Sequence, residues 1–162
     1  MIVNTPQQTF RAALGQFFVK ETSTENLAAA RSLIERSETA GADLLVLPEC
    51  IIARKLGMPD WGQKHAEPLD GPFVSGLREA TRGRRVTVVC TVQAKIANES
   101  RYANDLLVIQ NGELRLTYQK IHLYDAFRGK ESSYAAPGDV LPQVLQIGPF
   151  KVGFLTCYDV RF

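Results

Sequence analysis

The sequence predicts an α/β fold built on a mixed sheet. Strand-like and helix-like patterns alternate through the first half of the chain, and paired strand patterns follow. The run 43–48 (DLLVLP) is almost wholly apolar, as in a strand covered on both faces. Asn111 and Gly112 stand between two apolar segments, and Asn-Gly is the preferred two-residue hairpin turn because both positions need positive φ. Helix crossovers followed by hairpins indicate parallel strands extended by antiparallel ones.

The first predicted unit is strand, helix, strand. Residues 10–17 (FRAALGQF) form a short apolar run and predict a buried strand. Residues 22–25 (TSTE) resemble a capping box, so a helix is predicted from there to about Ala40. Gly41 suits the helix end, and the strand 43–48 follows. The buried face of this helix is expected to hold Leu27, Ala30 and Ile34.

The second predicted unit is a loop, a helix and a strand. Residues 53–71 are rich in Pro, Gly and Asp and predict a loop. A helix is predicted from Phe73 to about Arg82, with Phe73 and Leu77 facing inward. The β-branched run 85–91 (RVTVVCT) predicts another buried strand.

The remaining elements are two predicted hairpins joined by a loop. Residues 106–110 and 113–118 flank the Asn-Gly turn. Residues 120–139 have no regular pattern and predict a loop. Residues 144–147 and 151–156 are expected to pair across a Gly-Pro turn.

Composition excludes several classes of protein. The chain has 162 residues, and nineteen Lys and Arg against seventeen Asp and Glu leave a charge of +2, so neither nucleic acid nor a membrane is expected as a partner. Cys50, Cys90 and Cys157 are dispersed and form no CxxC pair, so we expect no metal site and no disulfide framework. The opening MIVNTPQQTF lacks the pattern of a signal peptide. These observations predict a cytoplasmic protein with reduced thiols.

Three residues capable of chemistry follow different predicted strands. They are Glu49, Lys120 and Cys157. The ends of strands are where α/β proteins place their sites. A carboxylate, a fixed cation and a thiol are the base, oxyanion stabiliser and nucleophile of acyl transfer through a thioester. Backbone N–H groups at a helix start would also favour the thiolate of Cys157.

Each of these residues also has an ordinary structural interpretation. A lone cysteine is more often a small buried apolar residue. A glutamate after a strand is as often a solvated loop acid, and a lysine there usually extends along the surface. Only the combination favours chemistry.

Three segments resemble the signature blocks of the nitrilase (carbon–nitrogen hydrolase) superfamily, in the same order and at similar spacing. They are residues 44–49 (LLVLPE), 118–125 (YQKIHLYD) and 153–162 (GFLTCYDVRF). Residues 13–16 (ALGQ) and Asn104 fit the same pattern. The resemblance covers essentially the whole chain, and the combination is specific although no single block is.

The resemblance implies a Glu–Lys–Cys triad and no cofactor or metal. Glu49 would be the general base, Lys120 the stabiliser of the oxyanion, and Cys157 the nucleophile. Glu131 matches a second glutamate that many members carry, which would orient the lysine or the substrate. Tyr158 would supply a backbone N–H to the oxyanion.

The resemblance also implies a four-layer αββα sandwich. Residues 1–162 would be the N-terminal part of one carbon–nitrogen hydrolase domain, incomplete at its C-terminus, with homo-oligomers expected of the full-length form. The segment 122–127 (HLYDAF) is most similar to the small-amidase branch, which contains deaminated glutathione amidase and ω-amidase, so the expected partner is a small-molecule ω-amide. Nitriles, carbamoyl amines and other amides stay open. Within this pattern His122 and Asp125 are expected to be structural loop residues.

Two alternatives differ in class. The chain could be a catalytically inactive truncated fragment, or a binding module that keeps the fold without turnover. It could also be an unrelated α/β ligand-binding domain, in which case the three triad residues should lie far apart in space.

Overall fold

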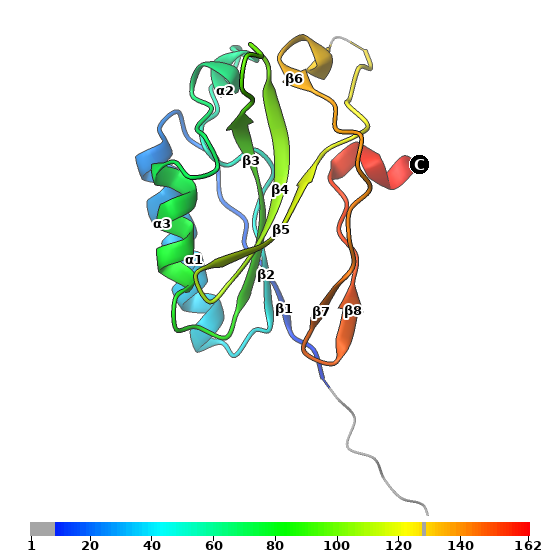
Figure 1. Cartoon of the computed structure of the whole chain (residues 1–162). Coiled ribbons are helices and arrows are strands. Elements are labelled where there is room, and N and C mark those ends of the chain that lie inside the picture. The colour runs from blue at the N-terminus through cyan, green and yellow to red at the C-terminus, as the bar shows by residue number, and fades with distance from the viewer. Residues whose placement is uncertain (1–8, 128) are drawn as a thin grey trace, which may run out of the picture.

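A six-stranded mixed sheet occupies the centre of the computed structural model, with two helices on one face and a separate hairpin on the other (Figure 1). The structure describes residues 9–127 and 129–162, so residues 1–8 of the opening segment considered for a signal peptide lie outside it. The predicted α/β class with a mixed sheet is confirmed. No helix in the described ranges is both long and apolar enough to cross a membrane.

The first three strands of the sheet run parallel and the next two antiparallel. In spatial order they are β1 (Ala12–Leu14), β2 (Leu44–Val46), β3 (Thr87–Lys95), β4 (Tyr102–Gln110) and β5 (Glu113–Gln119). The short strand β6 (Ala135–Ala136) pairs with the start of β4, parallel to it, beyond the end of β5. The predicted Asn-Gly turn joins β4 to β5, and both of its residues have positive φ (50° and 80°).

Two helices cover one face of the sheet. They are α1 (Ser23–Thr39) and α3 (Pro72–Thr81), which also contact each other. As predicted, Thr22 is the N-cap of α1, and its hydroxyl accepts the N–H of Glu25. Gly41 follows the helix end with a φ of +66°, a conformation that glycine adopts without a steric cost.

The sheet separates two apolar cores because successive residues of a strand point to opposite faces. Along β4, Leu107 and Ile109 pack toward the helices, whereas Leu106 and Val108 pack toward the other face. The helix-side core contains the four fully buried residues predicted for it, namely Ala30, Ile34, Phe73 and Leu77. The opposite core is covered by the hairpin of β7 (Leu145–Ile147) and β8 (Phe150–Val152).

Two predicted strands differ from those observed. The buried strand predicted over 10–17 is only the three residues of β1, which lie at the sheet edge with Leu14 78% exposed. The strand predicted over 151–156 ends at Val152 and pairs only with β7. Phe154 leaves the ladder to pack into the second core, so the assumption that Cys157 directly follows a buried strand is wrong.

Two predicted loops contain short elements. Residues 53–71 include α2 (Trp61–Lys64), and residues 120–139 include β6 and the 3-10 helix η1 (Glu131–Ser133). Elements of two to four residues are too short to show a period in the sequence. Their place depends on tertiary pairing, as the hydrogen bonds of β6 to β4 show.

Candidate active site

Three of the five predicted site residues meet around one buried ammonium group. The Nζ atom of Lys120 lies 3.1 Å from Oε1 of Glu49, and 3.1 and 2.9 Å from the two carboxylate oxygens of Glu131. The Lys120 side chain is 2% exposed, Glu131 11% and Glu49 36%. Because Cys157 lines the same pocket as Glu49 and Lys120, the alternative that the three triad residues lie far apart is excluded.

Lys120 is placed by the pairing of β4 with β5. Asp105 faces Gln119 in the register, and the next pair continues it, since the Lys120 N–H donates to the carbonyl of Asn104 at 3.0 Å. The side chains of Lys120 and Asn104 therefore lie next to each other. The Asn104 Nδ2 group donates to Oε1 of Glu49 at 2.8 Å and to Oε1 of Glu131 at 3.3 Å.

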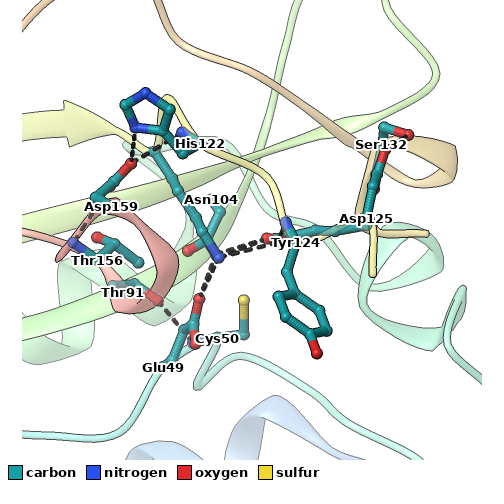
Figure 2. Close-up of polar contacts among 12 residues, drawn as sticks. Glu49, Cys50, Thr91, Asn104, His122, Tyr124, Asp125, Ser132, Thr156 and Asp159 are labelled. Carbon is teal, nitrogen blue, oxygen red and sulfur yellow. Dashed lines mark hydrogen bonds and ion pairs between the residues drawn. The ribbon is translucent and has the colours of Figure 1, made fainter. Parts of the chain in front are cut away.

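Side chains of β3 hold the turn that carries Glu49. The N–H of Cys50 donates to Oγ1 of Thr91 at 2.7 Å (Figure 2). Gln93 accepts the N–H of Ile52 and donates to the carbonyl of Cys50. Cys50 has a φ of +56°, a left-handed conformation that costs a non-glycine residue roughly 1–3 kcal/mol and is retained where surrounding contacts determine it.

The loop after β5 folds back to present Glu131. The N–H of Tyr124 donates to Oε2 of Glu131 at 2.7 Å. Asp125 accepts hydrogen bonds from the N–H and hydroxyl of Ser132 (Figure 2). These contacts agree with the expected structural role of Asp125, since they fix the segment on which Glu131 stands.

Two carboxylates, those of Glu49 and Glu131, pair with the one ammonium group of Lys120. Burial by itself would lower the pKa of Lys120, but the charge of Glu49 and the hydrogen bonds and charge of Glu131 outweigh it and raise the pKa. Lys120 is therefore a permanent cation at neutral pH. A fixed cation on the floor of a pocket stabilises negative charge that develops on a substrate oxygen.

Cys157 lies on the rim of the same pocket. It begins the 3-10 helix η2 (Cys157–Arg161) with a φ of +48°, and it is exposed. The expectation that its thiolate is favoured is wrong: partial burial raises the pKa of Cys157, the charge of Glu49 raises it further, and Lys120 opposes both without reversing them. The resting group is a thiol, so a nucleophilic role requires a base beside it.

Asp159 ties η2 to the sheet, a role that the sequence did not reveal. Its Oδ1 atom accepts the His122 N–H at 2.8 Å and lies 3.0 Å from His122 Nδ1 (Figure 2). Its Oδ2 atom accepts the Tyr118 hydroxyl at 2.8 Å and the Thr156 N–H at 3.3 Å. Burial alone would raise the pKa of Asp159, but these hydrogen bonds outweigh it and lower the pKa. Two residues from Cys157, this buried carboxylate fixes the turn that carries the thiol.

Tyr158 is half-buried beside the nucleophile. Its ring packs edge-on against Tyr124 and Phe162, with centroids 5.3 and 5.5 Å apart. Phe162 in turn stacks on His122 at 3.9 Å, which agrees with the structural role expected of that histidine. These contacts hold the first turn of η2 beside the pocket.

The pocket has a volume of about 430 Å³. Glu49, Lys120, Glu131 and Cys157 line one part of it, and the segment from Ala53 to Gly62 lines another. No group of three or more His, Cys, Asp or Glu residues in the described ranges could hold a metal ion.

Comparison with known proteins identifies the family. A family model described as "Carbon-nitrogen hydrolase" matches residues 11–162. Deaminated glutathione amidase of Escherichia coli O157:H7 is 34% identical over 93% of this chain and 57% of its own length. Hydrolase Rv0480c of Mycobacterium tuberculosis is 36% identical over 94% of the chain and 54% of its length. Omega-amidase NIT2 of Xenopus tropicalis is 29% identical over 94% and 56%.

Solved structures share the fold. XC1258 from Xanthomonas campestris, a CN-hydrolase superfamily protein with an arsenic adduct in its active site, matches with a TM-score of 0.81 at 25% identity, over 96% of this chain and 56% of that one. An amidase from Nesterenkonia sp. AN1, in which acrylamide has added to the active-site cysteine, matches with a TM-score of 0.79 at 26% identity, over 95% and 59%. The chain spans a little over half the length of these relatives. Because the family model matches nearly all of it, this chain belongs to the carbon–nitrogen hydrolase family.

Proposed function

We propose that this protein is a thiol-dependent amidase that cleaves a small ω-amide, such as deaminated glutathione, through a thioester on Cys157. The observation that supports this most is the Lys120 ammonium held between Glu49 and Glu131 in the pocket that Cys157 also lines. A base, a cation and a thiol in one pocket match the needs of acyl transfer.

The acylation half-reaction gives a role to each group of the triad. Glu49 accepts the proton of the Cys157 thiol as sulfur attacks the amide carbon, which forms the C–S bond and moves the carbonyl electron pair onto oxygen. Lys120 and the backbone N–H of Tyr158 stabilise that oxyanion. The oxyanion then collapses, the C–N bond breaks, and Glu49 returns its proton to the leaving nitrogen, which departs as ammonia.

The deacylation half-reaction repeats this chemistry with water. Glu49 accepts a proton from water as the water oxygen attacks the thioester carbon. The C–S bond then breaks, and Glu49 returns that proton to sulfur. Glu131 holds Lys120 in place and does not contact the reacting atoms. The raised pKa of the resting Cys157 thiol fits this scheme, because the proton must pass to Glu49 in each cycle.

An exposed arginine supports an anionic amide as substrate. Arg54 lines the pocket, and its guanidinium forms no ion pair within the part of the chain that the structure describes. The neighbouring Lys55, by contrast, is paired with Glu21 at 2.7 Å. An arginine is suited to bidentate binding of a carboxylate, the group that a small ω-amide carries at its other end. The names of the relatives, deaminated glutathione amidase and omega-amidase, agree with this class.

The test is release of ammonia from an ω-amide by the purified chain. We expect hydrolysis by the wild type, a loss of at least about a thousandfold in Cys157→Ala, and little change in Cys90→Ala, which removes a buried thiol from the helix-side core. Arg54→Gln should raise KM for the ω-amide and leave that for a neutral aliphatic amide unchanged. A folded chain that releases no ammonia, or releases it equally in Cys157→Ala, rejects the proposed activity and supports the inactive fragment.

A further inference from the structure

The two glutamates of the site differ in how completely their oxygens are bonded. Both oxygens of Glu131 accept hydrogen bonds: Oε1 from Lys120 and Asn104, and Oε2 from Lys120 and the Tyr124 N–H. In Glu49, Lys120 and Asn104 both donate to the same atom, Oε1. Within the described residues no N–H group donates to Oε2 of Glu49, and a hydrogen bond between Cys157 and Glu49 is one cause of the raised pKa of Cys157.

Asn104 donates a hydrogen bond to each of the two glutamates. Its one Nδ2 group donates to Oε1 of Glu49 at 2.8 Å and to Oε1 of Glu131 at 3.3 Å. Asn104 is fully buried on β4 and lies beside Lys120 across the strand pair. Two adjacent donors on a rigid sheet therefore converge on one oxygen of Glu49 and leave the other available.

The orientation of the Asn104 amide is set by charge. Its Oδ1 atom is buried and has no hydrogen-bond partner among the described residues. The reverse orientation would place that oxygen against two carboxylate oxygens, which repel it. An unpaired buried acceptor lowers the stability of the fold. The two hydrogen bonds from Asn104 Nδ2 to the charged glutamates offset that loss.

We propose that Asn104 is a positioning residue: it holds Glu49 so that Oε2 is the atom that accepts the proton of Cys157. Glu131 does not take this role, because both of its oxygens already accept hydrogen bonds. The inference rests on the role of Glu49 as base in the proposed function. It concerns proton transfer within the site, however, and can be tested without amide turnover.

The test is alkylation of Cys157 by iodoacetamide in the full chain, followed by peptide mass mapping between about pH 5.5 and 8. In this reaction sulfur forms a bond to carbon, iodide leaves, and the thiol proton passes to Glu49 Oε2. Because Glu49 accepts the proton as sulfur attacks, the assisted reaction needs no thiolate formed beforehand, so the wild-type rate should change little with pH across this range. Cys50 and Cys90 serve as internal controls because burial raises the pKa of each to about 12.

The variants separate positioning from folding. We expect Asn104→Leu to lower the rate at pH 6.5 about tenfold or more, and to make it rise nearly tenfold per pH unit, as for an unassisted thiol. Adding Asn104→Leu to Glu49→Gln should change the rate less than about twofold, because the base is already absent. Thr87→Val is the matched control: it also removes a buried oxygen without a partner in the described chain, far along β3 from the site, and should leave the profile unchanged.

The outcomes are distinct. A folded Asn104→Leu with the wild-type profile overturns the inference, and so does an equal loss in the Glu49→Gln background. If Asn104→Leu does not fold, Asn104→Ser is measured instead, since serine is too short to reach both carboxylates and must give the same steeper profile. A chain that hydrolyses no amide but shows this coupling refutes the proposed function and supports the role of Asn104.

Discussion

Removal of the Lys120 ammonium should be the most destabilising single change in the site. In Lys120→Met, the side chain keeps its length and loses its charge, so Glu131 and Glu49 face each other without a cation between them. Removing one partner of a buried ion pair costs about 3–5 kcal/mol because it leaves an uncompensated buried charge. Glu49 is 36% exposed, and solvent screens its share. We therefore expect the lower end of that range, about 3 kcal/mol.

Urea unfolding at pH 7.5 measures this change. With a denaturant slope of about 2 kcal/mol/M, a loss of about 3 kcal/mol lowers the urea midpoint by about 1.5 M. Adding Glu131→Gln to Lys120→Met removes the most buried charge left behind, and should restore at least about 1 kcal/mol. The matched control is Lys64→Met, which breaks a surface pair with Asp60 at 2.6 Å and should cost no more than about 0.5 kcal/mol.

Two results would refute this reasoning. One is a midpoint for Lys120→Met that matches that of Lys64→Met, which would mean that water screens the cluster as it screens a surface pair. The other is a further loss on adding Glu131→Gln, which would mean that Glu131 stabilises the fold through its other hydrogen bonds more than its unpaired charge destabilises it.

Three further predictions concern the pKa of Cys157, the close contact of Gly138 with β5, and the buried carboxylate of Asp159. Glu49→Gln should lower the pKa of Cys157, because the negative charge that raises it is removed, and the alkaline rise of its alkylation rate should move to lower pH. Gly138→Ala should cost about 1–3 kcal/mol in thermal or urea unfolding, because the added methyl group meets a backbone carbonyl oxygen of β5, whereas Gly153→Ala, with open space around it, should cost far less. Asp159→Asn should be destabilising at pH 7. Because the folded pKa of Asp159 is lowered, its contribution is present above about pH 4 and is lost as pH falls through the folded pKa, so the stability difference between wild type and variant should shrink as pH falls below about 4.

The arrangement of the site agrees with both the raised pKa of the Cys157 thiol and the proposed nucleophilic chemistry. The same carboxylate that disfavours the Cys157 thiolate is the group that can accept its proton. Lys120 keeps a carboxylate partner after the proton has moved, because Glu131 still bonds it through both oxygens when Glu49 is neutral. Charge is thus available for the oxyanion throughout the proposed reaction.

Local sequence patterns were enough to predict the helix α1 and the β4–β5 hairpin. Thr22 and Gly41 mark the ends of α1 because caps and left-handed glycines act over one turn of chain. The Asn-Gly turn fixes the β4–β5 hairpin for the same reason. The strand predicted over 151–156 is too long: β8 ends at Val152, because Phe154 packs into the core on the hairpin side of the sheet.

The sequence by itself determined the mixed α/β class, the family resemblance and the choice of Glu49, Lys120, Glu131 and Cys157 as candidate site residues, because each follows from residues close together in the chain. Only the tertiary structure decided that Glu49 and Glu131 both bond the ammonium group of Lys120, and that the pKa of the Cys157 thiol is raised. It also decided that Asn104 bonds Glu49 and that Asp159 bonds the loop at His122. Hydrogen-bond saturation and charge coupling depend on distances between segments far apart in the chain, and no local pattern encodes those distances.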